Sequence, residues 1–588
     1  MSILTESLAD RIAKPGDETA EKGATGRVAP TGNRSYVAGE TQPPLKYITI
    51  PEMFRETVAR FGPRDALIFP AEDLRLSYYD LDREVDALAS GLLALGLAKG
   101  DRLGIWSPNR PEWIFTQYAT ARIGVILVNI NPAYRLSELD YALNKAGCKA
   151  LILAEKFKSS DYFKMIRSLA PELENCEPGR LSAAKLPLLK IVVGLGKDPG
   201  PGMFSFDEIR RLGGPAQQLR LDGLSADLSP DDPINIQFTS GTTGAPKGAT
   251  LTHYNIVNNA ANVVDRMNFT EADRLCIPVP LYHCFGMVMG SLGCVARGAS
   301  MVFPGEAFEA EATLAAIAKT RCTALYGVPT MFVAMVDHPR LKDFDLSCLR
   351  TGVMAGAPCP IEVMRRVIGE MHMPEVTICY GMTETSPVSF QSHVNDPIEK
   401  RVATVGRVHP HVEVRIVDEA GRDVPVGETG ELWTRGYSVM RGYWEDAEKT
   451  AEAVVSGGWM RTGDLAILDK EGYCQIVGRL KDMIIRGGEN IYPREIEEFL
   501  FTHPDVQEVQ VFGIPDERFG EEVVAWIVQR EGGALTEEAV KAYCQNQIAH
   551  YKIPKYVRIV PELPMTVTGK PQKFIMRDEM MKMLGREK

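Results

Sequence analysis

One segment of the sequence combines glycines, hydroxyl side chains and a lysine in a pattern that could hold phosphate groups. It follows the apolar run at residues 234–238, which is typical of the end of a strand. Glycines let backbone N–H groups turn toward an anion, hydroxyls donate hydrogen bonds, and lysine adds positive charge. We expect this loop to bind a polyphosphate, with a plain Gly/Ser turn as the alternative. The candidate residues are Thr239, Ser240, Gly241, Thr242, Thr243, Gly244 and Lys247.

This loop differs from a Walker A phosphate loop. Lys247 lies six positions after Gly241, as that motif requires, but Pro246 and Gly248 replace the glycine and the Ser/Thr on either side of the lysine. The hydroxyl that ordinarily binds magnesium is therefore missing. The sequence predicts that a residue elsewhere holds the metal.

Further segments that could do chemistry follow the loop in order. They are residues 380–385 (Tyr-Gly-Met-Thr-Glu-Thr), 459–464 (Trp-Met-Arg-Thr-Gly-Asp), 478–482 (Gly-Arg-Leu-Lys-Asp), 486–493 (Arg-Gly-Gly-Glu-Asn-Ile-Tyr-Pro) and 568–570 (Thr-Gly-Lys). In this order and spacing they resemble the core motifs of the adenylate-forming superfamily, which contains acyl-CoA synthetases, peptide-synthetase adenylation domains and beetle luciferases. The resemblance spans residues 47–580. Residues 280–286 (Pro-Leu-Tyr-His-Cys-Phe-Gly) and 380–390 resemble fatty acyl-CoA synthetases in particular.

The resemblance implies an acid–thiol ligase that uses ATP, Mg²⁺ and coenzyme A. Such an enzyme activates a carboxylic acid as an acyl-adenylate, releases pyrophosphate, and then transfers the acyl group to the thiol of coenzyme A. The first step brings two anions together. It therefore needs positive charge, a metal ion and orientation more than covalent chemistry from the protein.

In this resemblance, residues 380–384 hold the nucleotide and its metal. Glu384 is implied as the Mg²⁺ ligand, which suits a hard carboxylate oxygen, and Thr383 as the contact to the α-phosphate. Tyr380 is implied to stack on adenine, with Gly381 and Met382 beside it. Taken alone, Glu384 would be read as a solvated surface acid and Tyr380 as a core tyrosine.

Other positions match the nucleotide and acyl subsites of the same superfamily. Gly356, Ala357 and Pro358 are implied to line adenine and the acyl chain. Asp464 is implied to accept hydrogen bonds from both ribose hydroxyls, which a carboxylate does well, and Arg479 to reach ribose or phosphate. Taken alone, Asp464 would cap a turn and Arg479 would be a surface cation.

The resemblance also implies residues for each half of the reaction. Lys570 is implied to bridge the carboxylate of the acid and the α-phosphate during adenylation. A rotation of the C-terminal domain about Lys481 would then bring Gly487 and Gly488 to the path of the pantetheine arm. His283 is implied as a gate between the acyl site and the thiol channel, with a hydrogen-bonded core histidine as the alternative.

The residues near the implied acyl site favour an apolar monocarboxylate. The run after His283 lacks the aspartate that amino-acid adenylation domains carry there, and Cys379 stands where malonate-activating relatives place an arginine. Met287, Val288 and Met289 predict an apolar, adaptable tunnel. Medium or long straight-chain fatty acids fit best, while branched, aryl and other short organic acids stay open.

Functions other than acyl transfer to coenzyme A share some of these motifs. Luciferase-like oxidation uses the same kind of site. A catalytically silent regulator that only binds a nucleotide or an acyl group is a second alternative. The joint presence of Lys570, Glu384 and Asp464 argues against the silent regulator.

Composition and charge exclude several classes of protein. The chain has 588 residues with a net charge of −11, so a nucleic-acid partner is not expected. The 11 cysteines include no Cys-x-x-Cys pair, which argues against a zinc ribbon or a disulfide framework. The first residues lack the pattern of a signal peptide or a presequence, and no stretch is apolar enough to span a bilayer. We expect a cytoplasmic protein, with peripheral membrane contact and the choice between monomer and homodimer left open.

The elements that must position these residues alternate between helices and strands. Apolar residues at helical spacing from Glu84 predict a helix that ends at Gly96 to Gly100, and residues 102–107 predict a buried strand after it. The same alternation recurs at residues 139–154 and 311–328. It indicates parallel sheets that are covered by helices.

The pattern changes in the last third of the chain. Strands joined by glycine-containing turns predict a small β-rich subdomain at residues 405–479, and a helix from Pro493 followed by further strands and helices predicts an α+β domain. We therefore predict an α/β protein with a mobile tail over residues 1–45 and an N-terminal nucleotide-binding domain over 46–479. A hinge at 480–482 and a small, mobile C-terminal domain over 483–588 follow.

Overall fold

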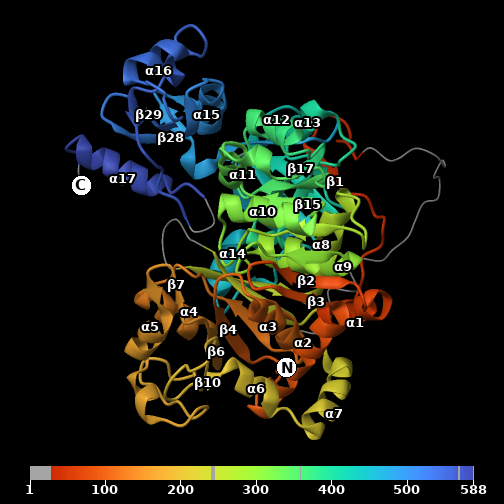
Figure 1. Ribbon diagram of the computed structural model, residues 1–588. Helices are drawn as coiled ribbons and strands as arrows, with labels where there is room; N and C mark the ends of the chain where they lie inside the picture. Colours follow the sequence, from red (N-terminus) through yellow and green to blue (C-terminus); the bar gives the residue numbers. More distant parts are fainter. Residues whose placement is uncertain (1–27, 240–245, 358, 567–569, 587–588) are drawn as a thin grey trace, which may run out of the picture.

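The predicted alternation of helices and strands is present in the computed structural model of the protein (Figure 1). The structure describes residues 28–239, 246–357, 359–566 and 570–586. It has an α/β fold with a large N-terminal body built on mixed sheets and a smaller C-terminal domain, which confirms the predicted fold class. Within these described ranges, no helix is both long and apolar enough to cross a membrane.

One sheet of the N-terminal body carries much of the candidate site just beyond the carboxyl ends of its strands. Its strands from β17 to β2 run parallel, and its edges are antiparallel. In sheet order the strands are β19 (Arg407–Val408), β18 (Val388–Gln391), β17 (Glu375–Gly381), β16 (Thr351–Ala355), β15 (Ala324–Gly327), β13 (Arg274–Cys276), β14 (Ser300–Val302), β2 (Asp65–Phe69) and β3 (Leu74–Ser77). The helices of this part are α1 (Ile50–Phe61), α8 (His253–Arg266), α9 (Gly293–Arg297), α10 (Ala310–Thr320), α11 (Pro329–Val336), α12 (Ile361–Glu370) and α13 (Ile398–Ala403).

A second sheet holds both strands that flank the candidate phosphate loop. In sheet order its strands are β10 (Phe204–Ser205), β9 (Ile191–Gly194), β6 (Ala150–Leu153), β4 (Arg102–Trp106), β5 (Ile126–Asn129), β11 (Pro233–Thr239), β12 (Lys247–Thr252) and β22 (Gly442–Tyr443). Its helices are α2 (Tyr78–Ala94), α3 (Pro111–Arg122), α4 (Leu136–Ala146), α5 (Tyr162–Leu169), α6 (Phe206–Leu212) and α7 (Pro215–Leu224), and the short strands β7 (Lys156–Phe157) and β8 (Ser160–Asp161) pair with each other. β11 and β12 pair with each other in antiparallel orientation.

The helix predicted from Glu84 is present as α2, but it begins earlier, at Tyr78. Its start is set by a capping box in which Ser77 Oγ accepts from Asp80 N and the Asp80 carboxylate accepts from Ser77 N. Its end agrees with the prediction, because Gly96 takes a φ of 81° that a residue with a side chain adopts rarely.

The β-rich subdomain forms an antiparallel sheet of β1 (Tyr36–Ala38), β20 (Val412–Val417), β21 (Gly430–Gly436), β24 (Trp459–Leu468), β23 (Val454–Val455) and β25 (Cys474–Arg479), with α14 (Ala447–Ala453) beside it. The prediction of a mobile tail over residues 1–45 is wrong for its last part. β1 pairs with β20, Val37 is 2% exposed, and Tyr36 OH donates to Glu413 Oε2 (2.6 Å). The strand is too short for its alternation to be read from the sequence, and its pairing is made across almost 400 positions.

The C-terminal domain is a separate body at the top of Figure 1. Its strands are β26 (Ile484–Arg486), β27 (Glu489–Ile491), β28 (Val506–Asp516), β29 (Gly520–Gln529) and β30 (Tyr556–Ile559), and its helices are α15 (Pro493–Phe501), α16 (Glu537–Cys544) and α17 (Lys573–Met583). The buried side chains on either face of this sheet pack among themselves, apart from the core of the N-terminal body. The domain therefore has hydrophobic cores of its own.

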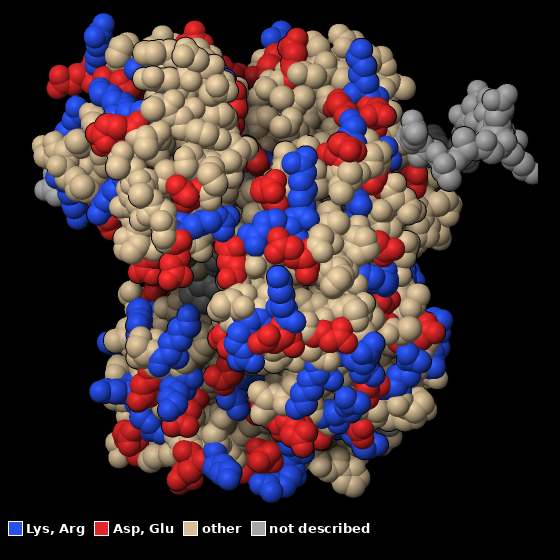
Figure 2. Space-filling model, turned by 45° about the horizontal axis from the view of Figure 1, so that its top comes forward, with Lys and Arg blue, Asp and Glu red and all other residues tan. Residues whose placement is uncertain are grey.

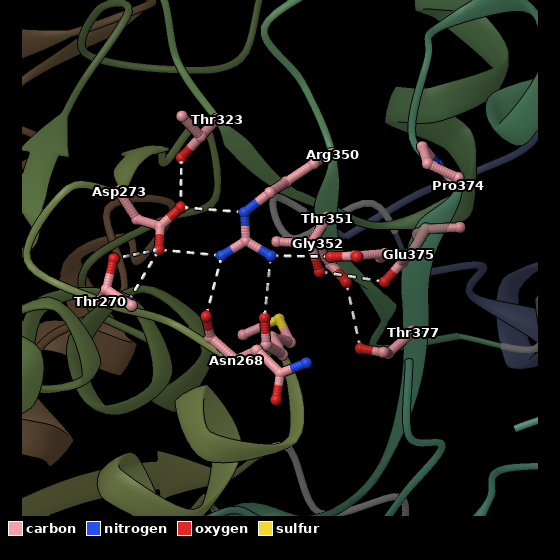
Figure 3. A network of polar contacts seen from close by, with 12 residues as sticks. Asn268, Thr270, Asp273, Thr323, Arg350, Thr351, Gly352, Pro374, Glu375 and Thr377 are labelled. Atoms are coloured by element: carbon pink, nitrogen blue, oxygen red, sulfur yellow. Dashed lines mark hydrogen bonds and ion pairs between the residues drawn. The ribbon is translucent and has the colours of Figure 1, made fainter. Parts of the chain in front are cut away.

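A polar network ties together the amino ends of the parallel strands in the first sheet (Figure 3). Asp273, Thr323 and Arg350 each precede a strand, and Glu375 begins β17. Arg350 pairs with Asp273 Oδ2 (2.8 Å) and with Glu375 Oε2 (2.7 Å), while Thr323 Oγ1 donates to Asp273 Oδ1 (2.7 Å). The Asp273 side chain is only 4% exposed, so its charge depends on these partners. The network joins the strands at the end of the sheet opposite to the candidate site.

Replacing Arg350 by alanine should destabilise the N-terminal body, because the buried Asp273 carboxylate would lose its cation. We expect the free energy of unfolding to fall by about 2–3 kcal/mol, less than for a fully buried pair because the guanidinium is partly exposed. Urea denaturation, monitored by tryptophan fluorescence, measures the change in the free energy of unfolding. The control is Arg422→Ala, which breaks an exposed pair with Asp418 and should cost less than about 1 kcal/mol. Equal losses in both variants would contradict the role of the network.

Candidate active site

A buried carboxylate lies just beyond the end of β17. Glu384 is part of the 3₁₀ turn Thr383–Thr385 and is 5% exposed. Its Oε1 accepts a hydrogen bond from Tyr443 OH (2.8 Å), and its backbone oxygen accepts from Met440 N (2.8 Å). The Lys247 ammonium lies 4.6 Å from the centre of the Tyr443 ring. The lysine at the end of the candidate phosphate loop and Glu384 therefore contact the same tyrosine.

Glu384 has the chemistry of a magnesium ligand. Mg²⁺ takes oxygen ligands, and in nucleotide sites it is held by one or two carboxylates together with phosphates and water. In the described part of the chain, no group of three or more His, Cys, Asp or Glu could hold a metal ion by itself. A metal at Glu384 would accordingly take its other ligands from nucleotide phosphates and water. The neighbouring Lys247 is suited to the same phosphates.

A second carboxylate is held by the tyrosine at the end of β17. Asp464 on β24 faces Arg479 on β25 (Nε to Oδ1, 3.2 Å), and Tyr380 OH donates to Asp464 Oδ2 (2.6 Å). Burial raises the pKa of Asp464, and the charge of Arg479 and the hydrogen bond from Tyr380 oppose this rise. Gly381 is required here, since a Cβ would lie 1.8 Å from Pro387 O, and Met382 packs against the core next to it.

Lys570 reaches this part of the site from the C-terminal domain. Its backbone is held by Thr566, whose Oγ1 accepts from Lys570 N (2.9 Å) and whose N donates to Lys570 O (2.8 Å). Lys570 Cε lies 4.0 Å from the point where a Cβ on Gly356 would stand, and Gly356 has a φ of 89°. Burial and the charge of Arg479 lower the pKa of Lys570, while Asp464 and Glu384 act to raise it. Residues from both domains are thus brought together around this ammonium group.

His283 lies close enough to this lysine to feel its charge. Burial, followed by the positive charge of Lys570, lowers the pKa of His283 to about 3, so the imidazole is neutral at physiological pH. Its Nδ1 accepts a hydrogen bond from Phe285 N (3.2 Å). The π-helix Phe285–Leu292 starts there and is buried along its whole length, including Met287 and Met289. This helix is therefore largely apolar, and the acyl tunnel that the sequence predicts here stays a prediction.

The predicted thiol-path glycines make contacts within their own domain. Gly487 and Gly488 form the turn between β26 and β27 with φ of 61° and 89°, and Gly487 N donates to Phe519 O (2.8 Å). Lys481 lies in the 3₁₀ turn Leu480–Asp482 that connects the two domains, and burial and Arg479 lower its pKa.

The structure covers the candidate phosphate loop only at its ends. Thr239 ends β11, Lys247 begins β12, and the two face each other in the antiparallel ladder. Ala357, from the predicted adenine-lining segment, borders a crevice between the domains. The other predicted residues, Ser240, Gly241, Thr242, Thr243, Gly244 and Pro358, lie outside the described residues.

Tyr443 is a site residue that the sequence did not reveal. It belongs to β22, which adds to the edge of the second sheet beside β12 and so places the tyrosine between Lys247 and Glu384. Burial and the Glu384 carboxylate raise the pKa of its hydroxyl, which keeps the proton in the hydrogen bond. A two-residue strand has no period in the sequence, so this placement could be found only in three dimensions.

Comparison with known proteins identifies the family. Residues 54–444 match the AMP-binding enzyme family, and residues 495–570 match the AMP-binding enzyme C-terminal domain. The chain is 47% identical to the mitochondrial medium-chain acyl-CoA ligase ACSF2 of Danio rerio, over 95% of this chain and 92% of that protein. It is 46% identical to the putative acyl-CoA synthetase YngI of Bacillus subtilis (strain 168), over 92% of this chain and 98% of the relative.

Solved structures resemble the whole arrangement. The anthranilate CoA ligase AuaEII in complex with anthranoyl-AMP superposes with a TM-score of 0.80 at 26% identity, over 92% of this chain and 98% of that one. ATP-bound MatB from Rhodopseudomonas palustris superposes with a TM-score of 0.76 at 31% identity, over 91% of this chain and 100% of its own. The chain belongs to the AMP-binding enzyme family, as an acyl-CoA ligase that uses ATP to convert a carboxylic acid to an acyl-adenylate and then to a coenzyme A thioester.

Proposed function

We propose that this ligase activates a medium-chain fatty acid, with Mg²⁺ at Glu384 and with Lys570 as the cation that joins the two reacting anions. The observation that carries the proposal is the position of Lys570. A lysine of the C-terminal domain lies over Gly356, where the charges of Asp464 and Glu384 act on it. A cation that is partly withdrawn from water between two carboxylates is suited to an anionic substrate that replaces water there.

In the first half-reaction, an oxygen of the acid's carboxylate forms a bond to the α-phosphorus of ATP while the bond to pyrophosphate breaks. Both reactants are negative, so the Lys570 ammonium lowers the barrier by lying between them. A bound Mg²⁺ would neutralise charge on the phosphates. Tyr443 holds Oε1 of Glu384, which fixes the direction in which the other carboxylate oxygen faces. Asp464 is held by Tyr380 and Arg479 and supplies acceptors for the ribose hydroxyls.

In the second half-reaction, the thiol sulfur of coenzyme A bonds to the acyl carbonyl carbon, AMP leaves and the thiol proton passes to water. Lys570 occupies the site during adenylation, so the C-terminal domain has to move before the thiol enters. We place the movement at Leu480–Asp482 and expect it to present Gly487 and Gly488. His283 is neutral because its pKa is lowered to about 3, so it can turn aside as a gate without moving a charge.

The medium-chain assignment rests on two lines of support. ACSF2 of Danio rerio carries a medium-chain name and shares almost half of its residues with this chain over nearly full length. The π-helix Phe285–Leu292, which begins two residues after His283, adds a buried and largely apolar segment next to the proposed site. An aryl acid is the second candidate, because the anthranilate ligase AuaEII has a similar fold over 92% of this chain.

Lys570→Ala should lower adenylation by about 10²–10³-fold, because a preorganised charge between two anions is lost. Exchange of labelled pyrophosphate into ATP measures this step. A synthetic acyl-adenylate supplied to the variant should still give the thioester at close to the normal rate. Lys582→Ala, an exposed lysine on α17 of the same domain, serves as the control and should change neither step. Normal exchange with slow thiol transfer would show that Lys570 serves the second half-reaction and not the first.

Glu384→Gln should keep the fold and lose most adenylation, because a neutral amide is a poor ligand for Mg²⁺. Tyr443→Phe keeps the carboxylate but removes the hydrogen bond to its Oε1. It should therefore raise the Mg²⁺ concentration that gives half-maximal exchange by about 10-fold. At saturating Mg²⁺, its exchange rate should fall less than that of Glu384→Gln. A magnesium titration of pyrophosphate exchange in each variant measures both effects. Near-normal exchange by Glu384→Gln at saturating Mg²⁺ would rule out the metal assignment.

Among acetate, octanoate, palmitate and benzoate, octanoate should give the highest kcat/KM for thioester formation. We expect it to exceed acetate by at least about 100-fold, since each buried methylene adds to binding in an apolar pocket. The assay measures consumption of free thiol at fixed ATP and coenzyme A. A preference for benzoate would mean that the substrate is an aryl acid and not a fatty acid. A preference for palmitate would mean that the substrate is a long-chain fatty acid and not a medium-chain one.

A further inference from the structure

The surface between the two domains is incompletely packed. None of the three hydrophobic clusters extends across it, and a cavity of about 50 Å³ lies within it. Figure 2 shows the groove where the C-terminal domain meets the N-terminal body. Pro329, Val333 and Pro360 line the cavity from one side, and Phe501 and Glu508 line it from the other. A surface of this kind favours movement of one domain against the other.

Polar contacts span this surface on its outer side. Arg530 Nη1 pairs with Asp337 Oδ2 (2.8 Å), and Asp337 Oδ1 is held in turn by Arg366 Nη1 (2.6 Å). The backbone of Arg530 is also fixed, because Arg530 N donates to Asp505 O (2.9 Å). Asp337 ends α11 in the N-terminal body and Arg530 follows β29 in the C-terminal domain. The pair therefore joins two rigid elements.

Further contacts lie closer to the hinge. Arg494 Nη1 on α15 donates to Ile476 O on β25 (2.8 Å), and the Glu498 carboxylate accepts from the backbone N–H of Ile361. Each contact joins the C-terminal domain to the N-terminal body in the orientation that carries Lys570 to Gly356. Loss of any of them would loosen that orientation without touching a reacting atom.

Glu508 differs from these contacts because it lies at the surface between the domains without a cation partner among the described residues. It lies on β28 and lines the cavity, and burial raises its pKa. Among the described residues no ion pair involves Glu508. A carboxylate that is withdrawn from water without a cation opposes the docking that buries it.

We infer that Arg530 and Asp337 are positioning residues that hold the C-terminal domain in its adenylation orientation, and that Glu508 destabilises this orientation so that the domain can leave for thiol transfer. The inference rests on the proposed function, in which Lys570 serves the first half-reaction only. A partly exposed ion pair is a weak contact, and an unpaired, half-buried carboxylate beside the cavity opposes it. The two orientations are then close in free energy, and either can be populated as the cycle requires.

Single variants at these positions should shift the two half-reactions in opposite directions. Arg530→Ala should lower pyrophosphate exchange by about 3- to 5-fold, the range expected for one partly exposed pair, and should leave or raise thioester formation from a supplied acyl-adenylate. Glu508→Gln removes the half-buried charge with little change of shape. It should leave or raise exchange and lower thioester formation by a similar factor. The double variant should return toward the wild-type ratio of the two rates.

Matched controls separate positioning from stability. Arg530→Lys keeps the charge and should retain most of the exchange rate. Lys541→Ala breaks the pair with Glu537 inside α16, where the lysine is 33% exposed against 37% for Arg530, and should leave the ratio of the two rates unchanged. The urea midpoint of each variant shows whether the fold has been weakened.

The outcomes distinguish this inference from the function on which it rests. If Lys570→Ala fails to lower exchange, the proposed role of the lysine is wrong. If that loss is found but Arg530→Ala and Glu508→Gln change both half-reactions equally, or in the same direction, the positioning role is overturned while the proposed function stands. Opposite shifts of the two rates, reversed in the double variant, support the inference.

Discussion

The arrangement of this protein depends on one positive charge that is supplied by one domain to carboxylates of another. The Lys570 ammonium is partly withdrawn from water, which disfavours its charged form, and Asp464 and Glu384 favour that form. Such a charge is useful only while the two domains are docked. The short connection at Leu480–Asp482 and the separate cores of the domains fit the proposal that this charge is supplied for one half-reaction and then withdrawn.

The opposite requirement applies to the N-terminal body, which must hold its carboxylates still. The amino ends of the parallel strands are tied by Asp273 and Arg350, so the carboxyl ends are free to carry irregular turns. Glu384 lies in such a turn, and Asp464 is supported by the antiparallel pair of β24 and β25. Rigid strand ends therefore hold Glu384 and Asp464 in place, and in the proposed cycle the domain that carries Lys570 is the part that moves.

The sequence predicted those features that depend on local pattern or on ordered motifs. Helix α2 has a clear apolar period, and its end is marked by Gly96. The fold class and the acyl-CoA ligase activity followed from motifs that lie far apart but keep their order. Features made by contacts between distant residues were missed. β1 and β22 are too short to show a period, so the pairing of Tyr36 with Glu413 and the support of Glu384 by Tyr443 had no local signal. The individual site roles stay predictions.

The separate hydrophobic cores have a consequence for how this protein can change over evolutionary time. The π-helix Phe285–Leu292, which we propose borders the acyl site, belongs to the core of the N-terminal body, whereas the segment that carries Lys570 is supported by the buried faces of β28, β29 and α17. A substitution that changes the size of a side chain in this helix is therefore absorbed by one core and leaves the other unstrained. Substitutions in this helix can therefore accumulate without strain on the core that supports Lys570.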